Sequence, residues 1–196
     1  METVAVILSR RSIVALAEPG PNAQQLELML RAATTVPDHG SLRPYRFLVS
    51  DGAGRERFGN ALAAAMLEAR PESPPAVLEK VRAKASAAPT QVLLIAAPHV
   101  GHKIAEWEQL AAAACTGYAI ALTAHALGLG ASWKNAPFDR GAALCEHLGL
   151  APHERLLGWI NVGQIAQPAA ERPAVDLRTL VGVVGADGIT AYEGPA

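Results

Sequence analysis

The chain has 196 residues and a formal net charge of −1, because its basic and acidic residues almost balance. Nucleic-acid binding depends on an excess of positive charge, so we expect no nucleic-acid partner. The length suits one domain with a substantial core, and we expect a single domain over residues 1–196. Hydrophobic residues make up 51% of the chain and charged residues 18%, below the roughly 25% of an average globular protein. Either part of the surface is buried against another subunit, or a codon bias towards alanine explains the composition.

Several features predict a cytoplasmic protein with no membrane partner. Cys115 and Cys145 form neither a CxxC pair nor a metal-ligand spacing, which fits reduced thiols. The N-terminus has no cationic segment followed by an apolar stretch, so we expect no export signal. The stretch from Gln109 to Trp133 contains no charged residue and is long enough to span a bilayer. Because Gly128 and Gly130 interrupt it and polar residues lie within it, we interpret it as a buried helix that leads into a strand.

In the first half of the chain, the patterns predict a helix from Thr3 to about Arg11 and a second helix that opens at Asn22. Gln25, three residues after Asn22, completes a capping box. The apolar face of this second helix repeats at helical spacing and consists of Leu26, Met29, Leu30 and Ala33. Pro37 stops it. A strand over 45–50, a helix over 53–69, a loop over 71–75 and a helix over 76–87 follow.

In the second half, we expect a buried strand over 91–97, a polar loop over 99–103 and a long helix over 105–128. This helix is apolar or small on all sides, a pattern typical of a helix that is buried all round. A strand over 130–134, a helix over 139–148 and a strand over 155–163 follow, before a tail rich in proline and alanine. The mixture of elements predicts an α+β fold.

Arg10 and Arg11 are followed directly by Ser12, and the predicted first helix places all three on one turn. Two guanidinium groups and a hydroxyl in this arrangement suit a phosphate, because arginine donates in a fixed fork geometry. The alternative is a solvated helix C-terminus, where arginine also interacts favourably with the helix dipole.

Two further clusters are candidate binding sites. The loop Pro37–Pro44 carries His39 and Arg43 between two prolines that stiffen it. The run Trp133-Lys134-Asn135 ends a predicted strand, where the tryptophan contacts either the core or a cofactor. The chain has no GxGxxG or GxxxxGK[ST] loop, no GxSxG elbow and no HExxH. We therefore expect no metal site.

Taken together, these motifs resemble the nitroreductase-like family of flavoproteins, in particular its minimal NAD(P)H nitroreductase branch. The resemblance runs from about Arg10 to Arg172, nearly the whole chain. Its landmarks are specific through their order and spacing: Arg10-Arg11-Ser12, Ala17-Glu18-Pro19, Pro37-Asp38-His39, Pro44-Tyr45-Arg46-Phe47, Gly54-Arg55-Glu56-Arg57-Phe58, Trp107-Glu108-Gln109 and Trp133-Lys134-Asn135. The resemblance implies a central, mainly antiparallel sheet flanked by helices, and a homodimer with FMN at the subunit interface.

The resemblance also implies roles for individual residues. Arg10, Arg11 and Ser12 would hold the ribityl phosphate and the pyrimidine edge of FMN, and Arg172 would close on the phosphate. His39 and Thr35 would belong to the flavin site of the partner subunit. The remaining cofactor-binding residues would be Trp133, Lys134 and Asn135. Because a cation near flavin N1–O2 stabilises the reduced ring, Lys134 is our candidate for that position.

The function implied by the resemblance is FMN-dependent oxidoreduction with NADH or NADPH as reductant. Hydride would pass through the flavin in a ping-pong sequence to a small oxidised substrate such as a nitroaromatic or a quinone. The flavin would carry the chemistry, so no catalytic side chain is expected. One alternative is an enzyme of the same fold with another oxidant, such as a dehalogenase or an enone reductase. Another is a flavin-binding module without turnover.

Overall fold

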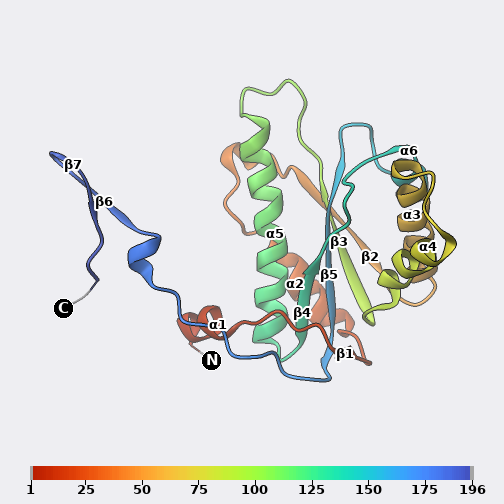
Figure 1. Ribbon diagram of the computed structural model, residues 1–196, viewed down its shortest axis with the longest axis horizontal. Helices are drawn as coiled ribbons and strands as arrows, with labels where there is room; N and C mark the ends of the chain where they lie inside the picture. Colours follow the sequence, from red (N-terminus) through yellow and green to blue (C-terminus); the bar gives the residue numbers. More distant parts are fainter. Residues whose placement is uncertain (1, 195–196) are drawn as a thin grey trace.

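In the computed structural model, which describes residues 2–194, one main sheet separates two layers of helices (Figure 1). Its five strands pair only antiparallel. They are β1 (Leu16–Ala17), β2 (Tyr45–Ser50), β3 (Thr90–Ala96), β4 (Gly130–Lys134) and β5 (Arg155–Ile165). The long strand β5 pairs with β3 along one side, and along its other side with β4 and β1. The predicted α+β class with an antiparallel sheet is confirmed. The ends of the expected domain, residues 1 and 195–196, lie outside the described residues.

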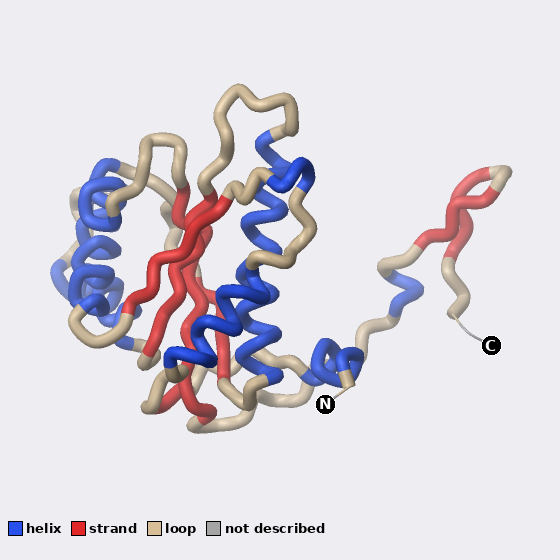
Figure 2. Tube along the Cα trace, turned by 180° about the vertical axis from the view of Figure 1, so that it is seen from behind, coloured by secondary structure: helices blue, strands red, loops and turns tan. Residues whose placement is uncertain are grey.

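The two helical layers are plain from both sides (Figures 1 and 2). One layer contains α2 (Ala23–Ala33) and α5 (Glu106–Ala126). The other contains α3 (Gly54–Ala69), α4 (Pro75–Arg82) and α6 (Ala142–Leu148). The short helix α1 (Thr3–Ser9) contacts α5 at the lower end of the first layer (Figure 1). Because β3 lies between two strands and two layers, all seven of its residues are buried.

Each layer closes its own core against the sheet. Under α3 and α6, Phe58 meets Trp159 edge-on, with ring centroids 5.1 Å apart. Under α2 and α5, Met29 and Ile120 pack on Val92 and Ile160. The start of α2 follows the predicted capping box, since the Asn22 side chain accepts from the Gln25 amide at 2.9 Å and the Gln25 side chain accepts from the Asn22 amide at 3.0 Å.

The prediction that the long helix is buried all round is wrong for this chain alone. Its inner face is buried and includes Thr116, Gly117 and Ile120. Its outer face is also apolar but exposed to solvent: Trp107 is 70% exposed and Tyr118 is 47% exposed. Hydrophobic periodicity cannot tell these faces apart, because both are made of small or apolar residues.

Several element boundaries differ from the expected ones, among them those of α1 and α6. Helix α1 ends at Ser9, so Arg10–Ser12 follow the helix and do not share one helical turn. Helix α6 starts at Ala142, three residues later than expected. There the carboxylate of Glu68 accepts from the Ala142 and Ala143 amides at 3.0 and 2.9 Å. These two hydrogen bonds lower the pKa of Glu68, and a carboxylate so far away in sequence is invisible to local patterns.

Beyond Arg172 the chain leaves the body as an extended arm (Figures 1 and 2). The arm carries a 3₁₀ turn, η3 (Leu177–Thr179), and a hairpin formed by β6 (Gly182–Gly185) and β7 (Gly188–Ala191). Residues 173–191 are exposed throughout, although many of them are apolar. Among residues 2–194, no helix combines the length and the hydropathy that a membrane span requires.

Candidate functional site

The segment that follows α1 brings two of the predicted phosphate ligands to the edge of the sheet. Ser9 is hydrogen-bonded to Nε2 of His125 in the last turn of α5, at 2.9 Å. The Ile13 amide then donates to the Ala131 carbonyl at 2.9 Å, which lays the chain against the edge strand β4. Arg10 and Ser12 therefore lie between the end of α5 and the edge of β4.

Arg172 joins this group from the far end of the sequence. Its guanidinium donates to the Arg10 carbonyl at 2.6 Å. The resemblance implied that Arg172 would close on the same phosphate as Arg10, and the structure brings the two residues together. Three chain segments thus meet here: the end of α1, the start of the arm and strand β4.

Arg11 behaves differently from Arg10. Its Nη1 donates to the carbonyls of Leu8, Ser9 and Arg10, each at 3.0 Å. These contacts satisfy carbonyl groups at the C-terminal end of α1, which is the helix-end role that the sequence left open. Within the described residues, the Arg10 guanidinium and the Ser12 hydroxyl make no such contacts and are available to a ligand.

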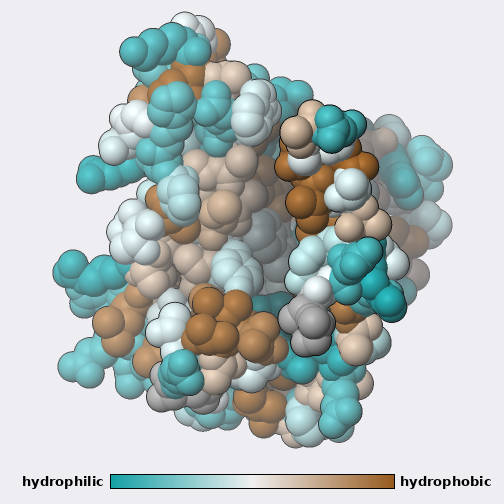
Figure 3. Space-filling model, turned by 90° about the vertical axis from the view of Figure 1, so that its left-hand side faces the viewer, coloured by the Kyte–Doolittle hydropathy of each residue, from teal (hydrophilic) through white to brown (hydrophobic). Residues whose placement is uncertain are grey.

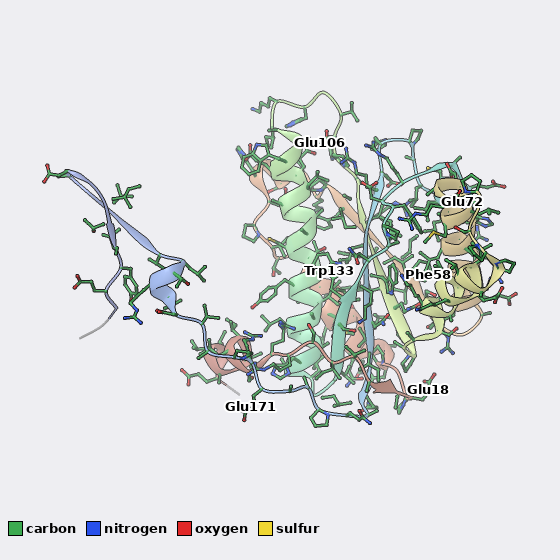
Figure 4. The ribbon with its side chains drawn as sticks, in the orientation of Figure 1. Glu18, Phe58, Glu72, Glu106, Trp133 and Glu171 are labelled. Atoms are coloured by element: carbon green, nitrogen blue, oxygen red, sulfur yellow. The ribbon has the colours of Figure 1, made fainter. Side chains whose placement is uncertain are left out.

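The strand end Trp133-Lys134-Asn135 is positioned by two glycines. At Gly117 of α5, a Cβ atom would lie 2.6 Å from Cζ3 of Trp133, so only glycine lets the indole pack this closely on the helix. Gly158 lies in a bulged part of β5 with a φ of +126°, and a Cβ there would lie 2.6 Å from Nε1 of Trp133. The indole stays 39% exposed beside α5 (Figure 4).

A cavity of about 280 Å³ opens at this strand end. Its lining consists of Lys84, Ala87, Trp133, Lys134, Asn135, Trp159 and Asn161. The two lysines have no carboxylate among their neighbours in this lining. Trp159 is fully buried, and its Nε1 donor has no hydrogen-bond partner in the part of the chain that the structure describes. Cationic and donating groups of this kind suit a planar ligand with carbonyl oxygens or ring nitrogens at its edge.

Sequence reasoning missed Lys84, Trp159 and Asn161 in this cavity. Lys84 lies in the 3₁₀ turn Ala83–Ser86, next to a strand that is distant in sequence from Trp133. Asn161 is held by Gln91, whose amide donates to its side-chain oxygen at 2.9 Å. The one available signal was a pair of polar residues inside two otherwise apolar strands, which is unusual for buried positions.

His39 and Thr35 lie away from this cavity. The Nδ1 atom of His39 is hydrogen-bonded to the carboxylate of Glu108 at 2.8 Å, in the first turn of α5. Glu108 and His125 are seventeen positions apart on α5, a rise of about 25 Å at 1.5 Å per residue. His39 and Arg10 are therefore at opposite ends of α5. Thr35 turns its hydroxyl back to the Ala32 carbonyl at 2.8 Å.

Residues 7–164 match the model of the Nitroreductase family. The chain belongs to that family. A similar protein is YdjA of Escherichia coli strain K12, which is named as an NAD(P)H nitroreductase. It is 32% identical over 163 residues, which cover 83% of this chain and 88% of YdjA. A protein from Haemophilus influenzae, also named as an NAD(P)H nitroreductase, is 32% identical over 165 residues, which cover 83% of this chain and 88% of that protein. The expected oxidoreductase class is confirmed.

Solved structures agree on the fold. A nitroreductase-like protein from Bacillus cereus superimposes with a TM-score of 0.79 at 20% identity, covering 94% of this chain and 96% of that one. A variant of the FMN and NADPH-dependent nitroreductase NfnB, from Sphigopyxis strain HMH, superimposes with a TM-score of 0.72 at 18% identity, covering 94% and 100%. The nitroreductase-like fold predicted from the sequence is confirmed.

Proposed function

We propose that this protein is an FMN-dependent NAD(P)H oxidoreductase that reduces nitroaromatics, quinones or similar small acceptors. The observation that carries the proposal is the cavity at the end of β4, where Lys84, Lys134 and the unpartnered Trp159 donor meet. The names of similar proteins, an NAD(P)H nitroreductase and an FMN and NADPH-dependent nitroreductase, support the same reductant and cofactor.

The residues present fit FMN along the edge of β4. Arg10, Ser12 and Arg172 offer a hydroxyl and two cations to a phosphate near the end of α5. Lys84 and Lys134 offer positive charge at the other end of the strand, where Trp133 and Asn135 also line the cavity. We assign Arg11 to the end of α1, with at most a supporting part in binding.

When bound, FMN supplies the redox chemistry, accepting hydride from NADH or NADPH and passing it to the oxidised substrate. The part of this chain is to bind and orient. Lys84 and Lys134 would stabilise negative charge at the edge of the bound ring, and Trp159 would form part of the wall that holds it. Trp133 limits access from the side of α5. A nucleophilic or proton-transferring side chain is not required.

We also propose an obligate homodimer with FMN at the interface. The exposed outer face of α5, the exposed Val4 and Leu8 of α1, and the apolar side chains of the arm support this. Hydrophobic surface gathers on this side of the molecule (Figure 3). Because about 25 Å of helix separates His39 from the phosphate end of the site, we assign His39 and Thr35 to the flavin of the partner subunit. Free thiols at Cys115 and Cys145 are compatible with a cytoplasmic location.

The test is to purify the protein, release the cofactor by denaturation and identify it, and then add NADH or NADPH to the FMN-loaded protein without oxygen. Rapid bleaching of the flavin supports a reductase, whereas a flavin-binding module leaves the flavin oxidised. Enzymes that reduce another acceptor, such as a dehalogenase or an enone reductase, also bleach. Nitroaromatic, quinone, haloaromatic and enone acceptors, added after bleaching, are then compared by the rate of reoxidation. A protein that neither carries FMN nor takes it up contradicts the proposal.

A further inference from the structure

A second cavity, of about 250 Å³, lies at the other end of the molecule, beside the first turn of α5. The loop from Pro98 to Ile104 forms one wall, and Arg140, which precedes α6, and the start of β5 form the others. Glu106, which lines it, is labelled at the top of α5 in Figure 4. None of its lining residues belongs to the cavity at the end of β4.

This second cavity carries a surplus of positive and donating groups. Its charged and imidazole side chains are His99, His102, Glu106, Arg140, His153 and Arg155. Glu106 is the only carboxylate in the lining, and it pairs with Arg155. Arg140 has no ion pair within residues 2–194, and the Nε donor of Arg155 is buried without a partner there. One guanidinium and one further N–H therefore remain for a ligand.

The loop that carries two of the histidines is held in place by the chain itself. Gln109, almost fully buried, accepts from the His99 amide at 2.8 Å and donates to the Ile104 carbonyl at 3.0 Å. The Ile104 amide donates to Nδ1 of His102 at 3.1 Å. Because Nδ1 is an acceptor, the hydrogen of a neutral His102 ring lies on Nε2, which makes this atom a donor. The loop and the His102 ring are thus held in place before a ligand binds.

We propose that this cavity binds a phosphate monoester group. Guanidinium groups match phosphate oxygens in charge and geometry, and imidazole N–H groups add further donors. The volume leaves room for the group to which the phosphate is attached. Two sources share this chemistry: the 2′-phosphate of NADPH and a separate phosphate monoester.

The first source rests on the proposed function. Ile104 of this cavity packs on Gly40, where a Cβ atom would lie 2.7 Å from its Cδ1. Gly40 directly follows His39, which we assign to the flavin of the partner subunit. The cavity then flanks that flavin, and its Arg140 distinguishes NADPH from NADH.

The direct test measures inorganic phosphate binding to the purified full-length protein, supplied with FMN, by titration calorimetry in a chloride buffer of constant ionic strength. Arg140→Gln should weaken phosphate binding at least tenfold, the effect of losing one charge-assisted hydrogen bond. Arg70→Gln is the matched control. It removes a guanidinium that does not line the cavity and makes no side-chain hydrogen bond in the described chain, so it should bind phosphate like the unmodified protein.

The source follows from steady-state kinetics with both reductants. A tenfold rise in KM for NADPH in Arg140→Gln, with KM for NADH unchanged, supports the 2′-phosphate. Unchanged KM values together with weakened phosphate binding support a separate phosphate monoester. If the unmodified protein does not bind phosphate at millimolar concentration, or if both variants bind it equally, the site is rejected. If neither reductant bleaches the flavin, the proposed function fails, but the calorimetric result stands by itself. Equal thermal midpoints of the variants exclude misfolding as the cause.

Discussion

The two helical layers on the sheet differ in the character of their outer faces. The layer of α3, α4 and α6 packs its large apolar residues, Phe58 among them, inward against Trp159, and its exposed side carries charged residues such as Glu68 and Lys80. The layer of α5 is apolar on both sides, with Trp107 and Tyr118 on an outer face that nothing in the described chain covers. One layer is thus complete within a single copy of the chain. The other has the composition of a surface that is buried on association.

The two layers also differ in whether nearby polar groups find partners within the chain. The α3 layer is secured within the chain by Glu154, whose carboxylate accepts from Arg46 at 2.6 and 2.7 Å and from the Ala151 amide at 2.7 Å. Near the α5 layer, by contrast, Arg10 and Ser12 have no such partners in the described residues. Stability of the first region is therefore expected to be a property of the monomer, whereas ligand binding at the second depends on a cofactor and a second copy.

The largest expected effect comes from placing a charge on the outer face of α5. Tyr118→Glu should raise the dissociation constant of the proposed dimer about a thousandfold or more, because an unpaired buried carboxylate costs several kcal/mol in each copy. FMN should be lost at the same time. Light scattering after size-exclusion chromatography measures the change, with cofactor content read from absorbance.

Val77→Glu is the matched control for that substitution. Val77 is an equally apolar, 40% exposed position on α4. The variant should elute like the unmodified protein and retain FMN, since α4 belongs to the completed layer. A dimer that survives Tyr118→Glu, or is lost in both variants, contradicts the distinction between the layers.

Arg10→Ala should weaken FMN binding about ten- to a hundredfold, the loss of one charge-assisted hydrogen bond of roughly 1.5–3 kcal/mol. Riboflavin, which lacks the phosphate, should bind both proteins with similar affinity. Fluorescence quenching of each flavin on binding measures the two constants. Arg11→Ala serves as the comparison: because Arg11 caps α1, it should affect stability more than the FMN-to-riboflavin ratio. Equal losses for FMN and riboflavin in Arg10→Ala would show that Arg10 does not contact the phosphate.

Glu154→Gln probes the completed layer. The hydrogen bond from Arg46 lowers the pKa of Glu154, against the opposing effect of burial. Its contribution to stability is therefore present at neutral pH and is lost as the pH falls below the ordinary glutamate value of about 4.3. At pH 7 the variant should lose about 2–3 kcal/mol of unfolding free energy, less than for a fully buried pair because the Arg46 side chain is 35% exposed.

Urea unfolding at pH 7 and pH 3.5 measures this prediction. The difference in unfolding free energy between the two proteins should narrow at the lower pH, because Glu154 is then mostly protonated in the unfolded chain, so that folding with an ionised carboxylate requires releasing that proton. The difference at pH 7 should not depend on protein concentration, because the ion pair lies within one chain. A gap that stays constant with pH would assign the loss to something other than the charge of Glu154.

Sequence patterns predicted best the elements whose starts are marked by residues next to them in the sequence. The strands at 45–50 and 130–134 were predicted to the residue, because Pro44 marks the start of the first, and Gly128 and Gly130 mark the start of the second. The capping box of α2 was predicted for the same reason. Strand β1 was not predicted, since its two residues become a strand only by pairing with the end of β5.

The candidate site was harder to predict for a physical reason. Arg10, Ser12 and Trp133 come from motifs, but the tertiary fold decides what surrounds them. Lys84 reaches the cavity only because the turn before β3 lies near the end of β4. Arg11 belongs to the same motif as Arg10, yet the end of α1 uses it differently. A sequence motif identifies the residues near a site, but it does not show which of them contact the ligand and which stabilise the neighbouring helix end.

The smallest and most specific prediction concerns whether Arg10 and His39 act on one flavin from different chains. Arg10→Ala and His39→Ala homodimers should each be impaired at both sites. In a mixed dimer of the two variants, one site collects both defects and the other collects neither. The mixed dimer should therefore recover about half of the activity of the unmodified protein, by site counting alone.

The experiment co-expresses the two variants with different tags and isolates the mixed dimer by sequential affinity steps. Its activity per dimer is compared with both parents and with an identically tagged dimer of unmodified chains, which controls for the tags. The opposite ends of α5 make the expectation sharp, because about 25 Å of helix separates the two residues within one chain. If both acted on the flavin of their own chain, every site of the mixed dimer would carry one defect. Its activity would then fall between those of the parents, with no recovery.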